Sequence, residues 1–196
     1  MPKNSRAGGT RIAANYKFGL TSVKIHVILF ILLGRGRAGI NMSAYDELYV
    51  AKIKHTQGKM FFHIREEFPG ADEKWFIKRY MKSDIRKFLD HANPKLAAKP
   101  APELIHAFIN RKCGGEYKRG EQWGGFLLQW VGEIYSLYQW KYEVPSAKLI
   151  DILPLSDMER MYIPGHQMGW DAAVKKIHDV LVNRKIQKGG ESDEEI

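Results

Sequence analysis

The stretch EQWGGFLLQWVGEIYSLYQW, residues 121–140, is the segment that decides the fold. It holds three of the chain's five tryptophans, and its charged residues are Glu121 and Glu133. On a helix, most of the apolar side chains would share one face: Trp123, Phe126, Leu127, Trp130, Ile134, Leu137 and Tyr138. A smaller apolar set would lie largely on the other side: Leu128, Tyr135 and Tyr142. A helix that is apolar nearly all round is a buried one. We therefore expect a central core helix from about Glu121.

Two other interpretations of this stretch are weaker. A transmembrane helix is disfavoured by its polar and charged positions: Gln122, Gln129, Glu133, Gln139 and Lys141. A base-stacking platform usually has a cationic groove, and this segment is almost free of basic residues. Glu133 is unusual here, because a buried carboxylate needs a partner or shifts its pKa upward. It is expected at a boundary or hydrogen-bonded by a Tyr or Trp, and the functional alternative is an acid in a pocket.

From Met42 onward the pattern is helical throughout, without alternating strand patterns or Asn-Gly and Asp-Gly hairpin signals. Local signals predict a first helix over 44–68, helix starts capped by Asp72 and Ser83, and a helix end at Asn93-Pro94. A proline-rich connection over 94–102 leads to a helix from Pro102 to Cys113. After the central helix, the sequence predicts a helix start at Pro145-Ser146, a capping box from Ser156 to Glu159, a turn at Pro164-Gly165 and a last helix from His166 or Trp170. Ile85, Phe88 and Leu89 are expected to point inward. The prediction is one all-α domain, residues 42–187, with six or seven helices packed around Trp123, Phe126, Trp130, Ile134 and Tyr138. A polar tail, residues 188–196, is expected to be disordered.

The positive charge is concentrated at the N-terminus. The net charge of the chain is +9, but residues 1–41 contain seven of its 31 Lys and Arg residues and no Asp or Glu. The remaining 24 basic and 22 acidic residues give a net charge of +2. Binding of nucleic acid by residues 42–196 is therefore not expected.

Residues 1–41 have three interpretations. The first is a mis-assigned start, because Met42 is followed by a normal helix start and GRGRAGIN, residues 34–41, resembles a translated ribosome-binding region. The second is a secretory signal or anchor, because the apolar run 25–33 follows a basic beginning, although Arg35 and Arg37 come directly after it. The run is too short for a membrane span of about 20 residues. The third is a genuine basic arm. No membrane association is expected unless this segment is a real signal or anchor.

Candidate sites for metal and nucleophilic chemistry are incomplete. Glu103 and His106 have the spacing of one Glu-x-x-His motif, whereas di-iron bundles need two such motifs and two further glutamates. His63 lies near two glutamates but completes no ligand set. Cys113 is the only cysteine, which excludes a cysteine zinc site in a monomer and fits a structural role. No metal and no cofactor is expected.

Arg86 and His91 have the Arg-x4-His spacing of the HEPN superfamily of helical ribonucleases, which this segment partly resembles. In such a pair the cation stabilises phosphate charge and the imidazole moves a proton. Lys87 departs from the family pattern, which usually has a small polar residue there. Catalysis by Arg86 and His91 is the alternative function, and it requires that both side chains share an accessible cleft.

His166, Gln167, Trp170 and Asp171 cluster at a predicted turn and are the candidate partner-binding residues. Their alternative role is to cap the start of the last helix. QWGGFLLQWVGEIYSLYQWKYEVPS (122–146), followed by PLSDMERMYIPGHQMGWDAAVKKI (154–177), resembles small helical bacterial proteins of toxin–antitoxin-like gene cassettes, mainly over residues 117–182. The resemblance implies a protein partner and a bacterial cytoplasmic setting, and it assigns no site. The expectation is a non-enzymatic, cytoplasmic interaction protein, in one form the antitoxin or accessory partner of such a cassette.

Overall fold

A computed structural model describes residues 44–190, with side chains to residue 184. The predicted segment 1–41 lies outside the described residues. The predicted disordered tail, 188–196, was begun too early, because residues 188–190 belong to the last helix; residues 191–196 lie outside the described part. Apart from an isolated antiparallel bridge between Ala71 and Arg119, the regular structure of the described part is helical. The all-α prediction is confirmed. In chain order the elements are η1 (Glu47–Tyr49), α2 (Val50–Glu67), α3 (Glu73–Met81), α4 (Asp84–Leu89), α5 (Pro94–Ala97), α6 (Ala101–Cys113), α7 (Gly125–Tyr142), α8 (Ser146–Ile152), α9 (Leu155–Gly165) and α10 (Trp170–Gly190).

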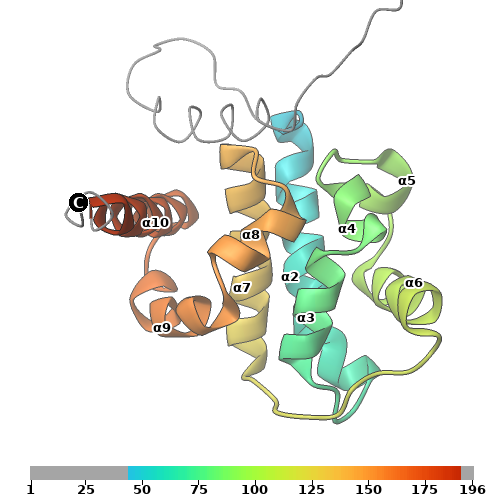
Figure 1. Cartoon of the computed structure of the whole chain (residues 1–196). Helices are drawn as coiled ribbons and strands as arrows, with labels where there is room; N and C mark the ends of the chain where they lie inside the picture. The colour runs from blue at the N-terminus through green and yellow to red at the C-terminus, as the bar shows by residue number, and fades with distance from the viewer. Residues whose placement is uncertain (1–43, 191–196) are drawn as a thin grey trace, which may run out of the picture. The chain divides into compact units, whose positions relative to one another are not determined.

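Helices α2 and α7 lie side by side at the centre, with α3 to α6 on one side and α9 and α10 on the other (Figure 1). The predicted core residues Trp123, Trp130, Ile134 and Tyr138 are buried. Phe126 was wrongly placed in the core, because its side chain is 76% exposed. The reason is that α7 begins at Gly125 rather than near Glu121, so Phe126 is in its first turn and not in its packed middle.

The α2–α7 contact depends on a close approach of two backbones. A Cβ atom on Gly132 of α7 would lie 2.7 Å from the carbonyl oxygen of Gln57 on α2. The Gln57 side chain closes the same contact, because its Nε2 donates to the Gly132 carbonyl at 2.8 Å. Both residues are buried. Any side chain at position 132 would force these two helices apart.

Several helix ends follow the local sequence rules. The Asp72 carboxylate accepts the Trp75 N–H at 2.9 Å, and the Ser83 hydroxyl accepts the Arg86 N–H at 3.2 Å. These bonds satisfy donors that have no partner inside the helix. Pro102 lies in the first turn of α6, and Gly114 ends that helix with φ at +63°, where glycine carries no steric penalty.

Other predicted ends were wrong for identifiable reasons. The first long helix begins at Val50 and not at residue 44, because Asp46 caps the short η1 turn first. Asn93 does not end a helix but caps α5, which lies inside the proline-rich connection and brings the α-helices of residues 44–190 to nine. Two further corrections concern α9: Ser156 lies inside its first turn, after the N-cap Pro154, and Pro164-Gly165 forms its last turn rather than a separate one.

Candidate functional site

The predicted partner-binding residues meet at the junction of two helices, residues 162–171, which we call the α9–α10 corner. His166, Gln167, Trp170 and Asp171 are all exposed there. His166 is the C-cap of α9, and Trp170 and Asp171 begin α10. The structure therefore brings these four residues together on one short segment at the surface.

Contacts with neighbouring helices hold the exposed side chains of the corner in place. The His166 ring stacks on Tyr162 with centroids 4.7 Å apart, and its Nδ1 lies 2.9 Å from the Tyr162 carbonyl oxygen. Lys54 Nζ of α2 lies 4.5 Å from the Trp170 ring centroid, a cation–π distance. Lys141 of α7 donates to the Asp171 carboxylate at 2.9 Å. These contacts orient the side chains and leave them accessible.

The backbone of the corner is anchored to the core. A Cβ atom on Gly165 would lie 2.6 Å from the ring of Trp130, so the absence of a side chain lets this turn pack directly on that indole. Trp130 also contacts Tyr162 edge to face at 5.6 Å. The corner is thus anchored on the core at Gly165 and Tyr162, and a surface held in place before binding lowers the entropic cost of binding.

Two apolar residues of the corner were missed by the sequence reasoning. Ile163 is 66% exposed and Met168 is 36% exposed, beside Trp170 at 38%. The helical pattern of α9 placed Ile163 near a turn but gave no signal that it faces solvent. Aromatic residues and methionine are enriched at the cores of protein interfaces.

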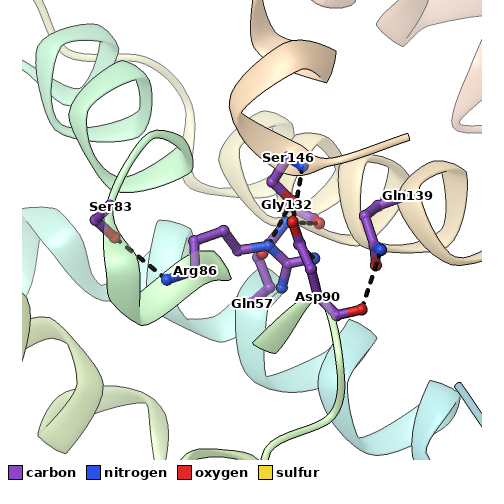
Figure 2. A network of polar contacts seen from close by, with 7 residues as sticks. All are labelled: Gln57, Ser83, Arg86, Asp90, Gly132, Gln139 and Ser146. Atoms are coloured by element: carbon purple, nitrogen blue, oxygen red, sulfur yellow. Dashed lines mark hydrogen bonds and ion pairs between the residues drawn. The ribbon is translucent and has the colours of Figure 1, made fainter. Parts of the chain in front are cut away.

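Arg86 belongs to a buried polar network rather than to an accessible site. Figure 2 shows its guanidinium beside Ser146 and Asp90, with Nε donating to the Ser146 hydroxyl at 2.7 Å and Nη2 lying 3.1 Å from an Asp90 carboxylate oxygen. The Ser146 N–H and hydroxyl donate to the same carboxylate at 2.8 and 2.5 Å, and Gln139 Nε2 donates to the Asp90 carbonyl at 3.2 Å. The network joins α4, α7 and α8.

This burial removes support from the ribonuclease alternative. The Arg86 side chain is fully buried and held by Asp90, whereas His91 is exposed on the chain beyond α4. Burial raises the pKa of the neighbouring Tyr80 hydroxyl to about 12, an effect that Arg86 partly opposes, so this tyrosine remains neutral. Arg86 therefore acts as a structural cation, and it does not share an accessible cleft with His91.

The remaining candidates form pairs or packing contacts. His106 Nε2 lies 2.7 Å from Glu67, and His63 contacts Glu66. Among residues 44–190 no group of three or more His, Cys, Asp or Glu side chains is arranged to hold a metal ion.

Glu133 is buried and accepts a hydrogen bond from Gln129 at 3.0 Å, so the donor is a side-chain amide rather than a Tyr or Trp. The free thiol of Cys113 is only partly exposed, in the last turn of α6. In the described part of the chain, no helix combines the length and apolarity of a membrane span.

Comparison with known proteins adds no assignment to this geometry. No family model, no curated protein and no solved structure matches the chain.

Proposed function

We propose that the chain is a non-enzymatic, cytoplasmic protein-interaction protein that binds a protein partner through the α9–α10 corner. The observation that carries the proposal is the exposure of Ile163, Met168 and Trp170 within eight residues of a turn fixed to the core. Fully buried aromatic and apolar anchors supply most of the free energy of protein–protein binding, and polar neighbours set its register. The partner is a folded protein with an apolar pocket for the Trp170 ring.

The resemblance to toxin–antitoxin-like cassettes supports one form of this function. In that form the chain is the antitoxin or accessory subunit, and the partner is the product of a neighbouring gene. The buried position of Arg86 also supports a non-enzymatic role, since it leaves the ribonuclease alternative without its phosphate-binding cation.

Site-specific photocrosslinking in cells of the source organism tests the proposal. A photoreactive amino acid replaces Gln167 in the corner or, as a control, the exposed Lys148 of α8. A protein crosslinked from position 167 and not from position 148 is then purified, and its affinity for the chain is measured by titration calorimetry. Absence of such a protein would contradict the proposal.

The matched variants are Trp170→Ala and Phe126→Ala, because both remove an exposed aromatic ring and only the first lies in the corner. We expect Trp170→Ala to weaken binding by about 2 kcal/mol or more, as for other hot-spot residues, and Phe126→Ala to leave the affinity unchanged. A partner that is sensitive to Phe126→Ala and insensitive to Trp170→Ala would show that the corner is not the binding surface.

A further inference from the structure

A groove of about 400 Å³ lies between α4, α5 and the C-terminal end of α6. We call it the α4–α6 groove. Its apolar side is formed by Ile85, Phe88 and Leu96, and it is bordered by Lys95, Arg111 and Lys112. It shares no residue with the α9–α10 corner.

Phe88 is the main apolar feature of the groove. It was wrongly expected to point inward, because 54% of its surface is exposed. On the six-residue helix α4, Ile85 and Leu89 occupy the buried face, and Phe88 is left beside the partly buried Leu96. Exposing this much of an aromatic ring forgoes part of the free energy that its burial would contribute. A ligand that covers Phe88 would recover part of that free energy.

The charge around the groove is positive and largely uncompensated. Lys112 forms an ion pair with Asp84, the one carboxylate that lines the groove, and this contact lowers the pKa of Asp84. Lys95 and Arg111 have no ion-pair partner among residues 44–184, so three cations and one carboxylate leave a local charge of +2. Arg79 adds a further cation close by, since it donates to the Lys112 carbonyl at 3.3 Å.

We infer that the α4–α6 groove binds an acidic peptide segment of another protein, with one apolar side chain of the peptide against Phe88 and Leu96 and its carboxylates beside Lys95 and Arg111. Charge complementarity selects an acidic ligand, and the apolar floor selects a side chain rather than a free anion. A single-stranded nucleic acid is the less favoured occupant, because such sites stack successive bases on several aromatic rings and this groove has one.

A peptide selection tests the inference without a known partner. A random dodecapeptide library displayed on phage is selected on the purified full chain and counter-selected on a Lys95→Glu/Arg111→Glu double variant. The enriched peptides are expected to carry several Asp or Glu residues around a Phe, Leu or Trp. A fluorescein-labelled copy of the most enriched peptide is then titrated by anisotropy.

Three variants identify where that peptide binds. Arg111→Glu and Phe88→Ser should each weaken it by about ten-fold or more, and added salt should weaken its binding to the native chain. Lys176→Glu changes an exposed lysine of α10 by the same charge and should have no effect. Because Phe88, Arg111 and Lys176 are all exposed, circular dichroism should show unchanged helicity in every variant.

Several results would overturn the inference. These are enriched peptides without an acidic excess, no enrichment at all, or equal affinity for the native chain and Arg111→Glu. Tighter binding of a labelled ten-nucleotide oligo-uridylate, abolished by Arg111→Glu, would replace the peptide with nucleic acid. Self-association lost in Arg111→Glu, measured by sedimentation, would replace it with a second copy. Because corner binding is measured with Trp170→Ala, either surface can fail without affecting the test of the other.

Discussion

Replacing Gly132 by alanine is the sharpest test of how the two central helices pack. The new Cβ atom would lie 2.7 Å from the Gln57 carbonyl oxygen and 3.0 Å from both the Gln57 carbonyl carbon and the Gly58 Cα. All three are backbone atoms of α2, so no rotamer change can relieve the overlap. The helices must separate, and the hydrogen bond from Gln57 Nε2 to the Gly132 carbonyl is lost or lengthened.

The expected change in the free energy of unfolding combines two destabilising contributions and one stabilising contribution. Overpacking costs about 1–3 kcal/mol, and the upper end applies because the obstacles are backbone. Weakening a buried hydrogen bond costs about 1 kcal/mol, and replacing a helix-interior glycine by alanine returns about 1 kcal/mol. The net prediction for Gly132→Ala is a loss of about 3 kcal/mol in the free energy of unfolding, which corresponds to about 6–12 °C in Tm for a chain of this size.

Urea unfolding followed by circular dichroism measures the effect, with Gly125→Ala as the matched control. Gly125 begins the same helix, and its added Cβ would also meet an atom at 2.9 Å. That atom belongs to the partly exposed ring of Phe62, which can rotate away, so the control should change stability by less than about 1 kcal/mol. A loss below about 1 kcal/mol in Gly132→Ala, or equal losses in both variants, would refute the close-packed arrangement of α2 and α7.

Two further predictions concern buried charges. Arg86→Ala should lower the free energy of unfolding by about 3–5 kcal/mol, because it leaves the Asp90 carboxylate buried without its cation. His91→Ala should change the free energy of unfolding by less than about 0.5 kcal/mol. Urea unfolding measures both variants, and a small effect of Arg86→Ala would contradict the structural role. Burial alone would raise the pKa of Asp157. Hydrogen bonds and positive charges from Arg184 and Arg160 outweigh the effect of burial, so the pKa of Asp157 is lowered. Its stabilisation is therefore present above the unfolded-state pKa of about 3.9 and is lost as the pH falls through the lower folded-state value. Stability measured at pH 7 and at about pH 3 should differ less in Asp157→Asn than in the native chain, and an unchanged difference would show that Asp157 is not the titrating group.

The features predicted correctly from the sequence depend on interactions within a few residues. Asp72, Ser83 and Gly114 act at helix ends through their own side chain or backbone freedom, so their positions are readable locally. The burial of Trp130 and Ile134 follows from a helix that is apolar on nearly every side. Such a helix must be central, whatever the path of the rest of the chain.

The features that escaped prediction depend on partners distant in the sequence. Ser146, sixty positions away, accepts the hydrogen bond from Arg86 Nε, and Asp90 supplies the ion-pair partner; the spacing of Arg86 and His91 contains no trace of the Ser146 contact. The predicted helix end at Asn93-Pro94 also placed both residues on one helix, but α4 ends at Leu89. The exposure of Phe88 was unpredictable for the same reason, since it depends on where α5 and α6 pack.

Arg86 and Phe88 differ in what their positions imply, although each departs from its usual place in a protein. The buried guanidinium of Arg86 has its charge partner, Asp90, and a hydroxyl acceptor, Ser146, within the fold, although neither Nη atom makes a hydrogen bond among the described residues. The ring of Phe88 is different, because no side chain among residues 44–184 covers its exposed part. It lies open in a groove lined by apolar side chains and cations. The Trp170 ring is also partly exposed, although Lys54 Nζ lies over it at a cation–π distance. Both positions leave apolar ring surface in solvent, which is why we infer that these two surfaces, and not the buried network, contact other molecules.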